Sequence, residues 1–492
     1  MKLSVLAQKI GANIPSQELE IEAVVQNPKD ATACSMFVCI RGARFNGHDF
    51  APKAYENGCR IFVASEPIKL PKDATVFSVT DTREALAKLS SALNGNPSKE
   101  IKLIGITGTK GKTTVAMLLT QVLNQSGISC GYIGTNGISY NNRLLPSQNT
   151  TPDPITLQST LRSMANDGVK AVILEVSSQA IYQSRVIGCE FDACVFTNLS
   201  SDHVGPNEHP TFAHYTECKH RLFTDFGCKL MVANSDDPYA TLMQSNTSAE
   251  RTVTYSQINE HADYVAKNVL PTLGKHGYGV SFSLHNEKDD LCCTLPMLGK
   301  FNVGNALAAV AVAKECFAIP ANKTLKILER ASVDGRTETV RLASGACAVI
   351  DYAHNGTSLR QLLSALREYK PRRLICLFGS VGERSFLRRR ELGDAAAQLC
   401  DLAILTSDNP GHEDPTAIIR EIAASFEGTN TPYFAIPDRF DAIKEALRLV
   451  KQEDILVLAG KGHEAYQLIG DEKIPFSERD ILTKLESNER SD

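Results

Sequence analysis

Runs of apolar residues recur along this chain and alternate with segments of helical pattern. In the middle of the chain, the apolar runs are KLIGIT, KAVILEV, DACVFTN and KLMVAN. After residue 334 the alternation repeats, with the runs CAVIDYA, RRLICLFG, LAILTSD and DILVLAG. Buried strands that alternate with helices are typical of a largely parallel sheet. The pattern therefore predicts two large α/β domains.

The first hundred residues show a third region, in which short strands lie between helical pieces. Its apolar runs are SMFVCI, RIFVAS and TVFSV. The segment ALNGNPSKE, rich in turn-forming residues, indicates a linker after it. We therefore predict a three-domain α/β protein: a small N-terminal α/β domain at residues 1–97, a central parallel-sheet domain at 98–333, and a C-terminal Rossmann-like α/β domain at 334–492.

Glycine and polar residues gather directly after the predicted strands. Ligands of open α/β sheets bind at the carboxyl ends of the strands, so these clusters are the candidate binding loops. They are GTKGKTT, EVSSQ, TNLSSDH, YAHNG, FGSVGER, TSDNP and AGKGHE.

The cluster TGTKGKTT follows a strand and precedes the helical segment VAMLLTQVL. The backbone N–H groups of such a loop, with the helix N-terminus, can bind phosphate oxygens. Lys112 would reach the terminal phosphates of ATP, and Thr113 would offer its hydroxyl to Mg²⁺. The usual pattern has a glycine where this chain has Ile106, and the alternative is an ordinary βα turn with a solvated lysine. The predicted ATP loop comprises Gly108, Thr109, Lys110, Gly111, Lys112, Thr113 and Thr114.

Two further polar residues follow predicted strands near this loop. Glu175 ends the apolar run VILEV and is either a solvated strand end or a metal ligand. We favour the metal ligand because the phosphate loop supplies a reason for a cation. An isolated histidine is more often structural, but His203 follows the polar cluster TNLSSD, which favours a functional role.

Composition narrows the possible partners. The net charge of −4 supplies no basic field that would attract nucleic acid or an anionic membrane. The N-terminal run is too polar for a signal peptide, and no run approaches the ~20 apolar residues of a membrane span. The 14 cysteines lack CxxC pairs, so we expect buried thiols and no disulfide framework. We expect a soluble cytoplasmic monomer without nucleic-acid or membrane partners.

Six motifs together resemble the Mur ligase family: TGTKGKTT, TNLSSDH, FNVGNALAA, DYAHN, TSDNP and AGKGHE. They occur in the family's order and spacing over nearly the whole chain, and are most similar to the members that add the third amino acid of the peptidoglycan precursor peptide. The resemblance implies that ATP phosphorylates a substrate carboxylate and that an amino group then displaces phosphate. The implied substrates are UDP-MurNAc-L-Ala-D-Glu, ATP and a free amino acid, with Mg²⁺.

The resemblance also assigns metal and ATP residues. Lys219 in YTECKHRLF would be carbamylated, and would otherwise be an ordinary surface lysine. One Mg²⁺ would bind Thr113 and Glu175, and the second would bind His203 and carbamylated Lys219. Arg336 would meet the transferred phosphate. The remaining implied ATP contacts, of which the asparagines are alternatively helix caps, are Asn302, Asn305, Asp351 and His354.

The nucleotide-sugar peptide would contact the first two domains by the same resemblance. Two departures from the family pattern are Gln179, where many relatives have histidine, and Pro28, where a serine is expected. The implied dipeptide contacts are Asn149, Thr150, Thr151, Ser177, Gln183 and Arg185. The implied contacts near the uridine end are Asn46, Gly47 and His48.

The third domain would bind the incoming amino acid. Arg384 would clamp its carboxylate, and the other implied contacts are Asp408, Asn409, Gly411, Gly460 and Glu464. Diaminopimelate-adding relatives usually have arginine at the position of Gly411, where it meets the distal carboxylate. A buried carboxylate without a partner is costly, so we favour L-lysine. For diaminopimelate to be the substrate, His412 or the run Arg388, Arg389 and Arg390 would have to substitute, although that run is more often a solvated helix face.

Two other functions stay open at this point. One is a different ligase of the superfamily, of folylpolyglutamate or cyanophycin type, against which the first domain, NTTPDP and GKGHE argue. The other is a nucleotide-binding regulator without catalysis, which Pro28 and Gln179 favour. The presence of Lys112, Glu175, His203 and Lys219 argues against it.

Overall fold

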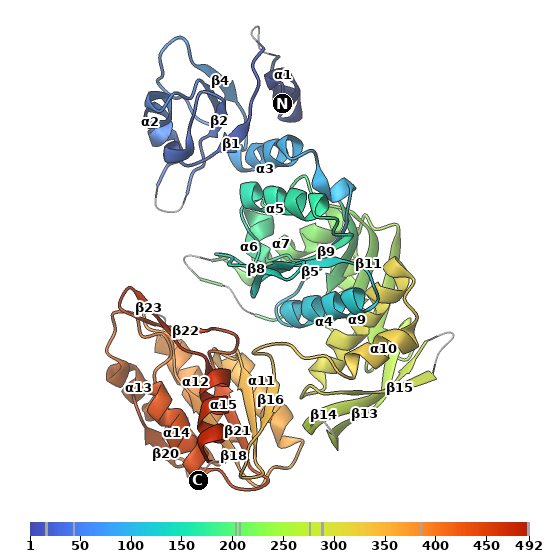
Figure 1. The fold of residues 1–492 in the computed structure, drawn as a ribbon, viewed down its shortest axis with the longest axis vertical. Coiled ribbons are helices and arrows are strands. Elements are labelled where there is room, and N and C mark those ends of the chain that lie inside the picture. Colours follow the sequence, from blue (N-terminus) through green and yellow to red (C-terminus); the bar gives the residue numbers. More distant parts are fainter. Residues whose placement is uncertain are drawn as a thin grey trace. The chain divides into compact units, whose positions relative to one another are not determined.

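A computed structural model describes residues 1–14, 18–42, 45–201, 204–205, 208–274, 277–286, 290–383 and 386–489 (Figure 1). The chain divides into two compact units. The first comprises residues 1–264 and 307–324, and the second comprises residues 265–306 and 325–492. We describe each unit by itself.

The first unit begins with a four-stranded parallel sheet in the order β1-β2-β3-β4. Helix α3 (Thr82–Leu93) begins where the Asp81 side chain accepts hydrogen bonds from two backbone N–H groups, and its apolar face packs with α1 on this sheet. Helix α2 and the sheet's other face form a second small core. These elements are α1 (Leu3–Lys9), β1 (Ala23–Val25), β2 (Ser35–Val38), α2 (Ala51–Glu56), β3 (Ile61–Ala64) and β4 (Thr75–Ser78).

The larger sheet of the first unit has the order β12-β11-β10-β5-β9-β6-β7-β8. Strands β12 to β6 in this order are parallel, and β6, β7 and β8 form an antiparallel meander. The strands are β5 (Lys102–Thr107), β6 (Cys130–Gly134), β7 (Gly137–Tyr140), β8 (Arg143–Leu145), β9 (Ala171–Glu175), β10 (Phe191–Phe196), β11 (Cys228–Asn234) and β12 (Arg251–Ser256). The helices are α4 (Lys112–Gln125), α5 (Pro154–Asn166), α6 (Ser178–Tyr182), α7 (Phe212–Thr224) and α8 (Ala240–Gln244).

The second unit contains an antiparallel set, β13 (Tyr264–Gly274), β14 (Gly277–His285) and β15 (Asp290–Leu295), and a six-stranded sheet in the order β16-β17-β21-β18-β19-β20. Apart from β16, the six strands are parallel, with an apolar core on each face. They are β16 (Glu338–Arg341), β17 (Cys347–Asp351), β18 (Leu374–Phe378), β19 (Leu402–Leu405), β20 (Tyr433–Ala435) and β21 (Ile455–Ala459).

Five helices and one hairpin accompany this second sheet. The helices are α11 (Gly356–Arg367), α12 (Phe386–Leu399), α13 (Pro415–Ala423), α14 (Arg439–Leu449) and α15 (Glu478–Glu489), and the hairpin is formed by β22 (Tyr466–Ile469) and β23 (Glu472–Pro475). Two more helices, α9 (Phe301–Phe317) and α10 (Ala321–Leu328), include residues of both units.

The predicted three-domain α/β class is confirmed, and each of the eleven predicted apolar runs contains a strand. The boundaries of the three domains remain a prediction.

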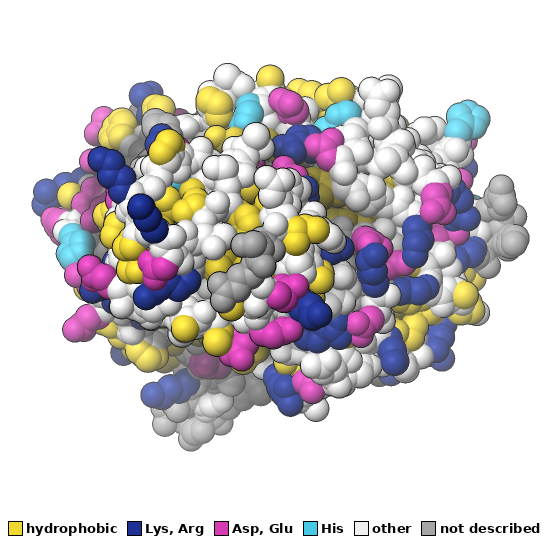
Figure 2. Space-filling view, turned by 90° about the horizontal axis from the view of Figure 1, so that it is seen from above, with side chains coloured by type: hydrophobic (Ala, Val, Ile, Leu, Met, Phe, Trp, Pro, Cys, Tyr) yellow, Lys and Arg dark blue, Asp and Glu magenta, His cyan; other side chains and the backbone are white. Residues whose placement is uncertain are grey.

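All fourteen cysteines are free, and most are buried, as expected. In the described part of the chain, no helix is long and apolar enough to cross a membrane. On the face drawn in Figure 2, basic and acidic side chains are interspersed.

A buried ion pair holds α14 and α15 in the second unit. Arg439 donates to Glu478 Oε1 from Nε (2.9 Å) and Nη2 (2.8 Å), and both side chains are almost completely buried. Arg439 also donates to the carbonyls of Ser407 and Ala459. Burial raises the pKa of Glu478, which the arginine opposes.

Removing one partner of this pair should destabilise the second unit strongly. Glu478→Ala leaves a buried guanidinium without its countercharge, which typically costs about 3–5 kcal/mol. Urea unfolding should show this loss. The matched control is Arg448→Ala, which removes an exposed pair with Glu445 and should leave the unfolding midpoint almost unchanged. An unchanged unfolding midpoint in Glu478→Ala would contradict the role given to this pair.

Candidate functional site

The phosphate loop connects β5 to α4, and glycines with left-handed backbone lie at both of its ends. Gly108 has φ +151° and Gly111, which precedes α4, has φ +86°. A Cβ on Gly108 would lie only 1.9 Å from the Thr197 hydroxyl oxygen. Glycine at 108 is therefore required by the close approach of the loop to the end of β10.

Residues after β10 hold the phosphate loop in place. Thr109 N donates to the Asn198 carbonyl (2.8 Å), and Lys110 N donates to the Asn198 side-chain oxygen (2.9 Å). The Asn198 amide in turn donates to the Lys110 carbonyl (3.0 Å). The loop is thus preformed, with its backbone fixed by Asn198. Asn198 was not predicted as a site residue, although its position after a strand, within TNLSSDH, was a usable signal.

Two lysines converge on the same carbonyl of this loop. Lys112 Nζ donates to the carbonyls of Gly108 (2.9 Å) and Thr109 (3.2 Å). Lys219 Nζ, carried by α7, donates to the Gly108 carbonyl at 2.8 Å, and its side chain is only 1% exposed. The surface-lysine alternative for Lys219 is therefore wrong. The side-chain nitrogens of two lysines thus meet at the loop that is predicted to bind phosphate.

Glu175 is a buried carboxylate beside the loop, so the solvated-strand-end alternative is wrong. Its Oε2 accepts from the Thr113 hydroxyl (3.0 Å) and the Thr135 hydroxyl (3.1 Å). Its Oε1 accepts from the Tyr132 hydroxyl (2.6 Å) and Thr135 N (3.0 Å). Four donors from β6, the following turn and α4 thus satisfy both oxygen atoms of this buried side chain. Tyr132 and Thr135 were not identified from the sequence.

The donor set at Glu175 and Thr113 fits Mg²⁺. Both residues offer oxygen atoms, which are the ligands this cation prefers, and they lie beside the predicted phosphates. The predicted second Mg²⁺ set includes His203, which lies outside the described residues. Carbamylation of Lys219 therefore remains a prediction, as does its role as a metal ligand.

Most predicted dipeptide residues lie together next to Glu175. Thr151 hydroxyl donates to the Glu175 carbonyl (2.7 Å) and accepts from Ser177 N (3.1 Å). Arg185 donates to the Thr151 carbonyl (2.7 Å) and to the Gln183 side chain (2.8 Å).

The other two predicted dipeptide residues belong to the same loop. Thr150 bonds Thr135 through their hydroxyls at 3.2 Å, whereas the Asn149 carbonyl accepts from the Ser147 hydroxyl. The structure thus places Thr150 next to Thr135 and Thr151 next to Glu175. The contact of these residues with a substrate remains a prediction.

In the N-terminal sheet, the predicted uridine-side residues form a tight turn. The Asn46 side chain accepts from His48 N (3.2 Å) and contacts the His48 ring nitrogen (2.8 Å). A Cβ on Gly47 would lie 2.5 Å from the Ile40 carbonyl oxygen. Pro28 begins a short 3₁₀ turn capped by Asn27. These contacts explain the local fold, and uridine binding remains a prediction.

In the second unit, the predicted ATP residues form a connected set. Asn302 donates to the Leu298 carbonyl (2.8 Å) and the Thr337 hydroxyl (3.1 Å), and Thr337 N donates to Asp351 (2.8 Å). Asn305 donates to Asn302 (2.9 Å). Both asparagines lie inside α9, so the helix-cap alternative is wrong.

Arg336 lines a cavity of about 440 Å³ in this unit. Its guanidinium lies 4.8 Å from the centre of the Tyr352 ring, and its buried Nε has no hydrogen-bond partner among the described residues. The His354 ring bonds the Tyr352 carbonyl at 2.9 Å. A buried guanidinium nitrogen without a partner suits an anionic ligand.

The predicted amino-acid residues surround a lysine that the sequence analysis missed. Lys461 Nζ donates to Asn409 (2.8 Å) and Glu464 (3.0 Å), lies 3.7 Å from Asp408, and is fully buried. Burial raises the pKa of Asp408. A Cβ on Gly460 would lie 2.8 Å from the Asp408 carboxylate. Arg384 lies outside the described residues. The signal for Lys461 was its place inside AGKGHE.

The residues considered as substitutes for a missing arginine have other partners. Arg389 is buried and donates to Glu413 and Glu421, each at 2.6 Å, so a solvated face is wrong for this residue. His412 bonds Asp471 at 3.1 Å on the surface. At Gly411, a Cβ would lie 4.0 Å from a Glu383 carboxylate oxygen. Arg389 and His412 thus already bind carboxylates of the chain itself.

Family models match three parts of the chain: "Mur ligase family, catalytic domain" at residues 28–93, "Mur ligase middle domain" at 106–313, and "Mur ligase, glutamate ligase domain" at 335–462. Similar curated proteins include the UDP-N-acetylmuramoyl-L-alanyl-D-glutamate--2,6-diaminopimelate ligases of Caldanaerobacter subterraneus subsp. tengcongensis and Clostridium botulinum. The first is 37% identical to this chain, and the match covers 95% of each of the two chains. The second is 36% identical, and the match covers 96% of each. A solved structure of a ligase of the same description has a TM-score of 0.73 at 28% identity and covers both chains fully. The descriptions of these three proteins name 2,6-diaminopimelate, whereas the residues of this chain led us to favour L-lysine.

Replacing the loop lysine should stop turnover without unfolding the protein. Lys112→Ala removes the cation nearest the phosphates, and losing one such group typically lowers the rate by about 10²–10³-fold. ATP-dependent phosphate release measures this, with circular dichroism as the folding check. The control is Lys99→Ala, which removes an exposed pair with Glu190. Wild-type turnover in Lys112→Ala would refute the phosphate role.

His463 should make stability fall as the solution is acidified. Burial first, and then the neighbouring Arg336 charge, lower the pKa of His463 to about 4. The unfolded chain takes up this proton near pH 6.5, so between about pH 6.5 and 4 acid favours unfolding. His463→Asn should flatten the fall in Tm across this range. Identical Tm curves for the variant and the wild type would contradict the buried neutral imidazole.

Proposed function

Because this chain belongs to the Mur ligase family, we propose that it joins the third amino acid to UDP-MurNAc-L-Ala-D-Glu. The reaction forms an amide bond and converts ATP to ADP and phosphate. Its product is a precursor of peptidoglycan. The match to relatives over about 95% of both chains supports this function over a folylpolyglutamate or cyanophycin type of ligase.

The observation that carries the proposal is the convergence of charges on one glycine loop. Lys112 and Lys219 reach the Gly108 carbonyl, and the Thr113–Glu175 pair lies at the start of α4. A carboxylate is a poor electrophile until it acquires a good leaving group, and phosphorylation supplies one. A preformed loop with cations aimed at it stabilises the charge that develops during phosphoryl transfer.

The residues of the first unit divide this task. The loop N–H groups that Asn198 does not engage are proposed to hold the phosphates, and Lys112 exchanges its loop carbonyls for phosphate oxygens. Thr113 and Glu175 would hold Mg²⁺, which when bound neutralises charge on the phosphates. Thr150, Thr151 and Arg185 lie beside Glu175 and are proposed to orient the acidic dipeptide. The unpartnered Arg336 Nε in the second unit supports a phosphate contact there.

For the third amino acid we propose meso-diaminopimelate. The support is the shared description of the relatives as diaminopimelate ligases. Glu464 and Asn409, held by Lys461, offer oxygen acceptors for an ammonium group. L-lysine is a second candidate, because Gly411 lacks a guanidinium and the nearby Glu383 carboxylate favours an ammonium over a second carboxylate.

Amino-acid-dependent phosphate release tests the function and separates the two candidates. Release should require both the nucleotide dipeptide and an amino acid, and mass spectrometry should show the joined product. We expect kcat/KM for meso-diaminopimelate to exceed that for L-lysine at least about tenfold, since a matched polar group is strongly discriminated. The reverse order would favour lysine. If no amino acid causes phosphate release, the ligase function is refuted and the alternative of a nucleotide-binding regulator is favoured.

A further inference from the structure

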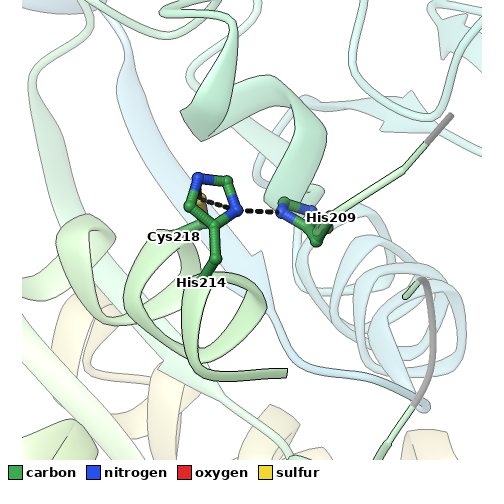
Figure 3. Close-up of side chains that lie close together, drawn as sticks. All are labelled: His209, His214 and Cys218. Atoms are coloured by element: carbon green, nitrogen blue, oxygen red, sulfur yellow. Dashed lines mark hydrogen bonds between the residues drawn. The ribbon is translucent and has the colours of Figure 1, made fainter. Parts of the chain in front are cut away.

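A cluster of two imidazoles and one thiol lies at the start of α7 (Figure 3). His209 precedes the helix, and His214 and Cys218 are four residues apart on one face of it. Their ligand atoms all lie within 4.8 Å of one another. We refer to these three residues as the histidine–cysteine cluster.

The distances within the cluster are close to those of a metal site. His209 Nδ1 lies 2.9 Å from His214 Nδ1, and the Cys218 sulfur lies 3.9 Å from His214 Nε2 and 4.0 Å from its Nδ1. Tetrahedral zinc, with Zn–N of ~2.0–2.1 Å and Zn–S of ~2.3 Å, separates its ligand atoms by roughly 3.3–3.6 Å. To seat an ion, the two imidazole nitrogens would move apart by about half an ångström, and the sulfur would move by up to about 1 Å.

The surroundings orient the rings as metal sites require. His209 is fully buried, and its Nε2 bonds the Ser178 hydroxyl at 2.9 Å, which fixes the ring while Nδ1 faces His214. This outer bond is the kind that aims a ligating imidazole. The Tyr182 ring meets the His214 ring edge-on at 4.9 Å. His214 is only half-buried, which leaves a route from solvent.

The donor atoms of the histidine–cysteine cluster favour a different ion from the Mg²⁺ that Glu175 and Thr113 would hold. Imidazole nitrogen and thiolate sulfur suit Zn²⁺ and other thiophilic transition metals, whereas Mg²⁺ prefers oxygen. Three protein ligands leave one coordination position for water or another small ligand.

We propose that His209, His214 and Cys218 bind one Zn²⁺, and that the ion ties the segment before α7 to that helix. On binding, the ring that carries the shared Nδ1 proton gives it up and takes up a proton at Nε2, so that both Nδ1 atoms offer lone pairs. The thiol proton of Cys218 is released to solvent, and two Zn–N bonds and one Zn–S bond form. Because Lys219 is the next residue and contacts the phosphate loop, the ion would stiffen the helix turn that carries it. The proposal does not depend on the ligase reaction.

Zinc titration of the full, metal-stripped protein tests the site. Excess Mg²⁺ should be present so that oxygen sites are occupied, and a chromophoric chelator should report affinity. We expect one tightly bound Zn²⁺ per chain and a raised Tm. Cys218→Ser and His214→Ala should each weaken binding by at least about tenfold. The controls are Cys292→Ser and His261→Ala, which change exposed residues.

Two further measurements keep the test independent of variant folding. Cobalt in place of zinc should give thiolate-to-metal charge-transfer absorption that Cys218→Ser abolishes. In the wild-type chain, Zn²⁺ should protect Cys218 from alkylation, as mapped by peptide mass spectrometry. Equal alkylation of Cys218 with and without Zn²⁺, or equal affinity in the variants and controls, would overturn the proposal.

Discussion

The close contact between the turn after β5 and the end of β10 is the constraint on which the site depends. Gly108 is admitted there only because it lacks a Cβ, and Asn198 then fixes the loop through three hydrogen bonds. Parallel pairing of β5 and β10 sets the two turns side by side. A loop fixed in this way presents its remaining N–H groups without reorganisation, which is the condition for strong electrostatic stabilisation.

Buried charged or polar side chains lie among the candidate site residues of both units. Glu175 accepts hydrogen bonds from four donors in the interior, and Lys219 reaches a loop carbonyl. In the second unit, Lys461 is surrounded by Asn409 and Glu464. By contrast, Arg439 is engaged by Glu478 and backbone carbonyls, which fits a structural role. A buried charge therefore indicates function only where its partners are also candidate ligand groups.

The sequence predicted the α/β class, the core strands and the glycine loop, because continuous apolar runs and a glycine-rich turn before a helix are local signals. It did not predict partners that meet only through folding, such as Asn198, Tyr132 and Thr135. Arg389 was misjudged as solvated because its acceptors Glu413 and Glu421 lie on distant segments. The cysteines were expected to be buried thiols without partners in CxxC pairs. Cys218 lies near His214 through a helical spacing, and near His209 only through folding, and neither contact is detected by a search for paired cysteines.

Equilibrium binding of ADP to Gly108→Ala most directly tests the claim that this loop holds the phosphates. Calorimetric titration should show at least about tenfold weaker binding than to the wild type, because the added methyl group displaces the loop from Thr197. Gly127→Ala is the matched control: it also changes a glycine with positive φ, but in open space. Unchanged ADP affinity in a folded Gly108→Ala protein would contradict the account.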